Sequence, residues 1–119
     1  MSEKLPLAIV GCGGMGHRHL YGLAELQDAG LSPFTLVGAC DPNLDNANSL
    51  ADQAAERLGT RPQPVGDLAQ LAAVAPIQAV DITTLPAHHH TVAIEAMERG
   101  WHVLCEKPMG LTARACKQI

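Results

Sequence analysis

With 119 residues, of which 47% are hydrophobic and 17% charged, the chain has the size and composition of one globular domain with a single core. Its formal net charge of −4, without any cluster of Lys and Arg, excludes the basic surface that nucleic-acid binding requires, so we expect no nucleic-acid partner. The N-terminal apolar run Leu5–Val10 is too short for a membrane span or a signal peptide, so we expect a cytoplasmic protein with no membrane partner.

Strand and helix patterns alternate along the sequence. The predicted strands lie at Leu5–Val10, Phe34–Cys40, around Val65, at 77–83 and at 101–105. The predicted helices lie at 15–29, Leu44–Leu58, 68–73 and 87–99, and a further one begins at Thr112. Asn43 and Asp67 are the predicted N-caps, and Gly30, Gly59 and Gly100 are predicted to end helices. Short turns between such elements indicate βαβ units, and right-handed crossovers favour a doubly wound parallel α/β sheet of order 3-2-1-4-5.

Residues 11–16 join the first strand to the first helix and match the pattern G-x-G-x-x-G through Gly11, Gly13 and Gly16. This pattern is typical of dinucleotide binding: the glycines allow a tight turn, a close approach of backbone to a diphosphate, and close packing of helix on strand. The N–H groups at the start of the helix would face the phosphates. The predicted diphosphate-binding residues are Gly11, Cys12, Gly13, Gly14, Met15 and Gly16.

Asp41 ends the second strand at about the interval after the glycines that is expected for the acidic residue of a dinucleotide site. Its carboxylate can accept hydrogen bonds from the adenosine ribose hydroxyls and would repel a 2′-phosphate, so NAD is favoured over NADP. The alternative is that Asp41 only caps the second helix or shapes the turn with Pro42.

Two further groups of residues follow predicted strands, Thr83 to Leu85 and Glu106 to Pro108. Ligands of such sheets bind at the carboxyl ends of the strands, which is where these groups, Asp41 and the glycines all fall. A lysine at this edge, Lys107, can donate to a substrate oxygen or a ribose hydroxyl and, if partly desolvated, take part in proton transfer. The alternative is a solvated charge pair of Glu106 and Lys107 before a turn.

No metal site is predicted. The four cysteines, Cys12, Cys40, Cys105 and Cys116, have no C-x-x-C spacing and are interpreted as small buried hydrophobes of a reducing compartment. Three consecutive histidines at 88–90 point in different directions at a helix start and cannot share one ion well. His17 and His19 are interpreted as surface or packing residues, although His17 could approach a phosphate.

Taken together, the motifs resemble the Gfo/Idh/MocA oxidoreductases. They are G-x-G-x-x-G-x-x-H at 11–19, A-C-D-P at 39–42, T-T-L-P at 83–86 with His89, and G-W-H-V-L-C-E-K-P at 100–108, the most specific of the four. The resemblance extends from about residue 5 to the end of the chain. It implies a Rossmann domain and hydride transfer between a nicotinamide cofactor and a sugar, polyol or related alcohol or carbonyl.

The resemblance also implies roles for single residues. Lys107 would be the catalytic residue, in contact with the substrate hydroxyl and the nicotinamide ribose, and Glu106 and Pro108 would shape its turn. The nicotinamide side would be lined by Thr83, Thr84, Leu85 and His89.

Family members are roughly two to three times longer, in line with a second α/β domain of ordinary size that holds an acid/base histidine. We therefore expect residues 1–119 to be a dinucleotide-binding domain, incomplete at its C-terminal end, that binds cofactor without turnover. The full-length protein is expected to be a homo-oligomer. Two alternatives stay open: a non-catalytic nucleotide-binding module, and a methyltransferase using S-adenosylmethionine, which usually has an acidic residue where this chain has Val10.

Overall fold

The computed structural model describes residues 5–31, 34–74, 76–83 and 86–105. Within them lies one parallel sheet, whose strands are β1 (Leu5–Val10), β2 (Phe34–Cys40), β3 (Gln63–Val65), β4 (Ala79–Ile82) and β5 (His102–Cys105). The strands are hydrogen-bonded in the order β3-β2-β1-β4-β5, which confirms the predicted doubly wound α/β topology.

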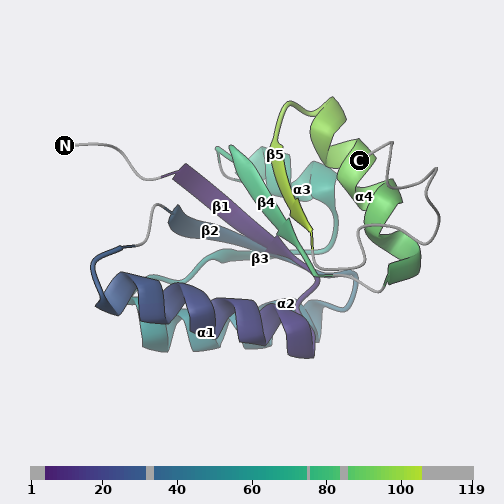
Figure 1. Cartoon of the computed structure of the whole chain (residues 1–119). Coiled ribbons are helices and arrows are strands. Elements are labelled where there is room, and N and C mark those ends of the chain that lie inside the picture. The colour runs from purple at the N-terminus through teal and green to yellow at the C-terminus, as the bar shows by residue number, and fades with distance from the viewer. Residues whose placement is uncertain (1–4, 32–33, 75, 84–85, 106–119) are drawn as a thin grey trace.

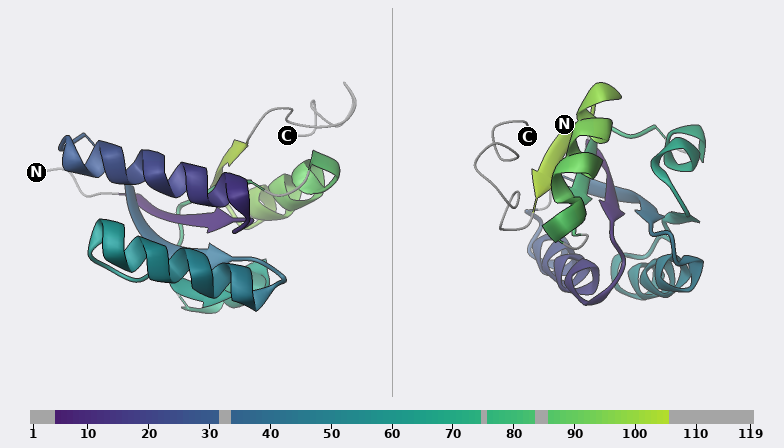
Figure 2. Two further views of the ribbon diagram at one scale, coloured as in Figure 1. Left: turned by 90° about the horizontal axis from the view of Figure 1, so that it is seen from below. Right: turned by 90° about the vertical axis from the view of Figure 1, so that its right-hand side faces the viewer.

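Helices cover both faces of this sheet (Figure 1). They are α1 (Gly14–Asp28), α2 (Leu44–Leu58), α3 (Leu68–Val74) and α4 (Pro86–Glu98). Figure 2 shows α1 and α2 side by side on one face, with α3 and α4 on the other. The chain changes face after β3, as a right-handed connection to the far side of β1 requires. In the part of the chain described, no helix has the length and apolar character needed to cross a bilayer.

Side chains of the central strand β1 alternate between the two faces of the sheet. Because helices cover both faces, the strand is buried on both. Ile9 packs in the cluster under α1 and α2, together with Leu20, Leu36 and Leu50. The neighbouring residues Ala8 and Val10 point the other way, into the cluster under α3 and α4. The two halves of the core therefore meet at the strand that leads into the glycine loop, residues 11–16.

The predicted helix ends are confirmed at the second and third helices. Asn43 accepts a hydrogen bond from the Asp45 N–H at 3.0 Å, and Asp67 accepts one from the Gln70 N–H at 2.7 Å, so each caps its helix. Gly59 ends α2 in the left-handed region at φ 87°, where a residue without a Cβ is favoured. The predicted helix after Thr112 lies outside the described residues.

The fourth strand is shorter than its predicted range of 77–83. It spans Ala79–Ile82, although the Gln78 and Thr83 N–H groups still donate to Pro6 and Val10 of β1, at 3.0 and 2.8 Å. Apolar character extended the prediction to Ile77, which instead packs partly buried against the α3 and α4 cluster before the strand begins.

Candidate functional site

The glycine loop turns sharply out of β1 and into α1. Gly11 has φ 101°, a conformation that favours glycine, and its N–H donates to the Cys40 carbonyl at 2.8 Å. Gly13 is the N-cap of α1 in an extended conformation, and Gly13, Gly14 and Met15 are exposed. The loop is thus fixed at its base and open to solvent at its tip.

The third glycine of the pattern allows α1 to pack on the loop. A Cβ on Gly16 would collide with the Gly11 carbonyl oxygen and stand 3.2 Å from Cδ1 of Leu50. A Cβ on Gly13 or Gly14 would meet nothing within 4 Å. Gly13 and Gly14 therefore border open space, whereas α1 and the loop pack too closely at Gly16 for any side chain.

The start of α1 is suited to an anion. Gly13 provides no side-chain cap, and there is no acidic residue in the first turn. The positive end of the helix dipole and its first N–H groups thus face the open side of the glycine loop. A diphosphate fits this arrangement, because it needs backbone donors and a close approach that side chains would block.

Asp41 lies beside the loop, at the end of β2. Its Oδ2 accepts a hydrogen bond from the Cys12 N–H and its Oδ1 one from the Asn43 N–H, both at 2.8 Å. The turn role considered as an alternative is therefore present, while the cap of α2 is Asn43. A carboxylate has about four acceptor positions, so these two bonds leave capacity for ribose hydroxyls.

Thr83, the residue directly after β4, supports the loop. Its hydroxyl donates to the carbonyl oxygens of Gly11 and, at 3.3 Å, of Val10. The side chain is buried, so these bonds are shielded from competing water. Thr83 thus contacts the backbone of the turn that Gly11 makes.

Cys12 and Cys40 are buried free thiols, as predicted for these two cysteines. Burial raises the pKa of each to about 12, with the negative charge of Asp41 contributing at Cys12 and that of Asp67 at Cys40. Both therefore stay protonated near neutral pH and serve as small apolar side chains. Cys12 Sγ also lies 3.4 Å from the Cys40 carbonyl oxygen.

The structure brings together the glycine loop, Asp41 and Thr83, all at the carboxyl edge of the sheet. Several other predicted site residues lie outside the described residues: Thr84, Leu85, Glu106, Lys107 and Pro108. His89 belongs to α4, but its side chain is not among those described.

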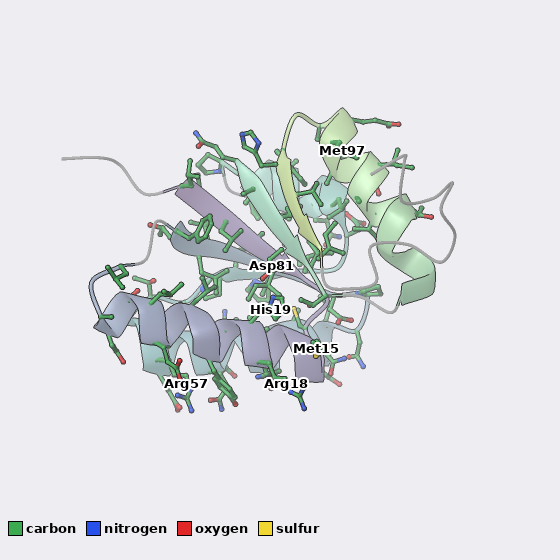
Figure 3. All side chains as sticks on the ribbon, in the orientation of Figure 1. Met15, Arg18, His19, Arg57, Asp81 and Met97 are labelled. Atoms are coloured by element: carbon green, nitrogen blue, oxygen red, sulfur yellow. The ribbon has the colours of Figure 1, made fainter. Side chains whose placement is uncertain are left out.

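Sequence reasoning missed a contact between α1 and β4. Nδ1 of His19 lies 2.5 Å from Oδ2 of Asp81, and Figure 3 shows the two side chains meeting between the helix and the sheet. The sequence predicts His19 only as a surface or packing residue. The available signal was Asp81 itself, since a carboxylate in a buried strand needs a polar partner.

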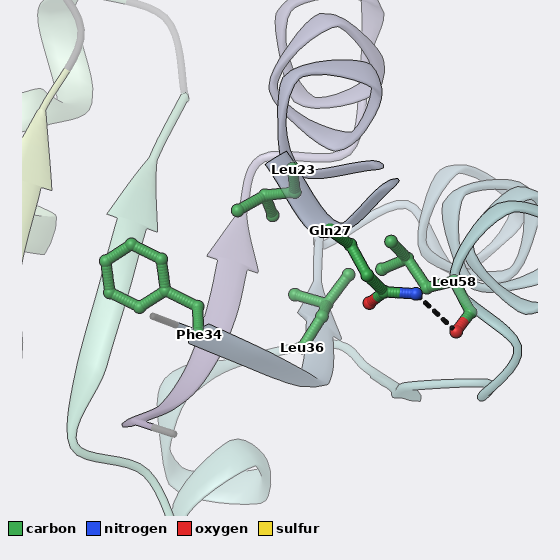
Figure 4. Close-up of a pocket in the computed structure, with 5 residues that line it drawn as sticks. All are labelled: Leu23, Gln27, Phe34, Leu36 and Leu58. Atoms are coloured by element: carbon green, nitrogen blue, oxygen red, sulfur yellow. Dashed lines mark hydrogen bonds between the residues drawn. The ribbon is translucent and has the colours of Figure 1, made fainter. Parts of the chain in front are cut away.

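A hollow between α1, β2 and the end of α2 lies away from these residues (Figure 4). Its lining includes Leu23, Leu36 and Phe34, the first residue of β2, and Gln27 crosses it to donate to the Leu58 carbonyl at 3.1 Å. It therefore lies towards the amino ends of the strands, and it is not part of the candidate site.

Comparison with known proteins agrees with this geometry. Residues 5–119 match the family described as "Oxidoreductase family, NAD-binding Rossmann fold". The inositol 2-dehydrogenase of Burkholderia cenocepacia is 30% identical over 115 residues, which are 97% of this chain and 32% of that protein. The chain thus spans about a third of the length of the curated relatives it matches.

Solved structures give the same result. A myo-inositol 2-dehydrogenase from Lactobacillus plantarum superposes with a TM-score of 0.74 at 27% identity, over 98% of this chain and 32% of that one. The WlbA dehydrogenase from Bordetella pertussis, solved with NADH and UDP-GlcNAcA, has a TM-score of 0.74 at 28% identity, with the same coverage. Neither the methyltransferase nor the non-catalytic module considered from the sequence gains support from these proteins.

Proposed function

The chain belongs to the Gfo/Idh/MocA family of oxidoreductases, which has an NAD-binding Rossmann fold, and from this premise we propose the function of its site. It forms the cofactor-binding part of an enzyme that transfers a hydride between NAD and a sugar, polyol or related alcohol or carbonyl compound. The observation that carries the proposal is the open start of α1, with Asp41 bonded to the glycine loop on one side and Thr83 on the other.

The glycine loop would hold the diphosphate of the cofactor. The backbone N–H groups at the start of α1 donate to phosphate oxygens, and the absence of side chains at Gly13 and Gly14 allows the close approach. Gly16 keeps the helix start against Gly11, which fixes the direction of these donors.

Asp41 would select the cofactor. Its carboxylate, held by two backbone N–H groups, is in place to accept hydrogen bonds from the ribose hydroxyls. The same negative charge disfavours the 2′-phosphate of NADP. We therefore propose a preference for NAD over NADP.

Lys107 is proposed as the catalytic residue, on the resemblance described above. When bound, the nicotinamide ring supplies the hydride acceptor or donor. The Lys107 ammonium would donate a hydrogen bond to the substrate hydroxyl, which holds that oxygen and favours loss of its proton. The same resemblance assigns the turn around Lys107 and the nicotinamide side to Glu106, Pro108, Thr83, Thr84, Leu85 and His89.

The substrate class rests on the relatives. The inositol dehydrogenases act on a polyol by name, and the WlbA structure contains a UDP-linked sugar acid. We propose that residues 1–119 form the dinucleotide-binding domain, and that the acid/base histidine and most of the substrate pocket belong to a second domain of the whole, oligomeric protein. The 119-residue polypeptide alone would then bind cofactor without turnover.

Calorimetric titration of the 119-residue chain with NADH, NADPH and S-adenosylmethionine tests the proposal. We expect saturable binding of NADH, weaker binding of NADPH, and no binding of S-adenosylmethionine. An assay with myo-inositol and NAD should give no NADH. Absence of NADH binding at millimolar concentration, or tighter binding of S-adenosylmethionine, would refute the assignment.

A further inference from the structure

Strand β4 and Thr83, the residue that follows it, contact the chain on both sides of the glycine loop. Before the loop, Thr83 bonds to the carbonyl oxygens of Gly11 and Val10. After it, His19, within the first half of α1, forms the 2.5 Å hydrogen bond to Asp81. Asp81 lies in β4 and Thr83 directly follows that strand, so this segment contacts the chain where it enters the loop and where it continues as a helix.

Asp81 is fixed in place by its surroundings. It is paired in register with Ile9, whose side chain lies under α1 and α2, and its neighbours Val80 and Ile82 point into the opposite cluster. Asp81 therefore faces α1 from within the sheet, with 7% of its surface exposed. Because a buried carboxylate is costly without hydrogen bonds, its bond to His19 resists displacement.

The apolar contacts of α1 do not define its position as closely. Leu20 packs with Ile9 and Leu36 of the sheet through non-directional contacts that tolerate small shifts along the helix axis. A hydrogen bond between side chains weakens steeply when its length or angle changes. The His19–Asp81 bond can thus set the distance and rotation of the amino half of α1 relative to β4.

We propose that His19 and Asp81 are positioning residues for the dinucleotide, a role that rests on the proposed function. The bond would hold the donors at the start of α1 in register with the end of β4, so that one cofactor can contact both. A site already in its bound geometry loses less free energy when the ligand binds. Neither residue needs to touch the cofactor for this.

The test compares the affinity of the 119-residue chain for NADH with its thermal stability. His19→Leu removes the ring nitrogen and should weaken NADH binding roughly tenfold, equivalent to about 1.4 kcal/mol. His19→Asn places an amide nitrogen near the position of Nδ1 and should restore most of the affinity. Asp81→Asn keeps the volume and removes the charge, and should weaken binding by a smaller factor.

Gln27→Leu is the matched control, because it removes the hydrogen bond between the other end of α1 and Leu58. It should lower the melting temperature and leave the NADH affinity within about twofold of the wild type, a change too small to indicate a lost hydrogen bond. Equal affinity in wild type and His19→Leu, with both folded by circular dichroism, would overturn the inference. Should His19→Leu not fold, unchanged affinity in Asp81→Asn would overturn it. A wild-type chain that binds no NADH would instead refute the proposed function.

Discussion

The carboxylate of Asp41 accepts a hydrogen bond from the backbone N–H of Cys12 at 2.8 Å, so the end of β2 is bonded directly to the glycine loop. The same side chain bonds to the Asn43 N–H, at the start of the turn into α2. One residue thus connects the proposed diphosphate and ribose subsites. Substitution of Asp41 should therefore change both the choice of cofactor and the order of the loop.

We expect Asp41→Ala to narrow the preference for NADH over NADPH. Charge-assisted hydrogen bonds contribute about 1.5–3 kcal/mol each, so NADH affinity should fall roughly tenfold or more, while NADPH gains from the loss of repulsion. Calorimetry with both cofactors measures the ratio. Asp45→Ala, which removes the same charge from an exposed position in α2, should leave the ratio unchanged. An unaltered ratio in Asp41→Ala would remove Asp41 from the ribose site.

Gly16→Ala should destabilise the fold. The added methyl group would collide with the Gly11 carbonyl oxygen, which belongs to backbone and cannot move aside without displacing the loop. Overpacking of this kind costs about 1–3 kcal/mol, occasionally more, and urea denaturation measures it. Gly22→Ala, in the same helix but facing open space, should instead stabilise the protein by up to about 1 kcal/mol. Equal effects of the two substitutions would contradict the packing of α1 on the loop.

The buried thiols predict loss of stability in alkali. The pKa of Cys40 is about 12 in the folded chain against the ordinary value of 9.0 for an exposed thiol, so the thiol of the unfolded chain loses its proton first as the pH rises. The stabilisation is complete below pH 9 and decreases as the pH rises towards 12. Urea denaturation between pH 8 and 11 should show the advantage of the wild type over Cys40→Ala shrinking with pH. A constant difference over that range would show that burial of Cys40 does not disfavour its thiolate.

The Thr83 hydroxyl should contribute to stability and binding together. Thr83→Val keeps the shape but leaves the carbonyl oxygens of Gly11 and Val10 without this donor. We expect a loss of about 1–2 kcal/mol in the free energy of unfolding and weaker NADH binding. Thr83→Ser retains the hydroxyl and should retain most of the affinity. If valine and serine behave alike, the hydroxyl bonds contribute nothing measurable.

Much of the fold follows from local patterns. The alternation of apolar runs with helical spacing identified each strand of the sheet, and right-handed connections then gave its order. Asn43 and Asp67 could be predicted as N-caps because a short polar side chain directly before a helix favours accepting a hydrogen bond from a backbone N–H of the first turn. The glycine loop was identifiable because its spacing encodes backbone requirements, of which the Gly16 contact is the clearest.

Contacts that depend on tertiary packing could not be predicted in the same way. His19 and Asp81 are far apart in sequence, and their meeting depends on which face of β4 is covered by α1. The extent of β4 was overestimated because Ile77 is apolar. Its side chain packs against the cluster under α3 and α4, but the residue does not belong to the strand. The sequence pattern reports burial of a side chain, but not the element that buries it.

Pro64 has a consequence for association between copies of the chain. It is the middle residue of β3, the last strand on its side of the sheet. The Val65 carbonyl accepts from the Asp41 N–H at 3.0 Å, so the backbone of Val65 faces β2 and that of Pro64, by alternation, faces outward. Proline has no N–H to offer an approaching strand, so a neighbouring molecule cannot form a regular ladder there. The missing N–H of Pro64 therefore disfavours edge-to-edge polymerisation at this border of the sheet.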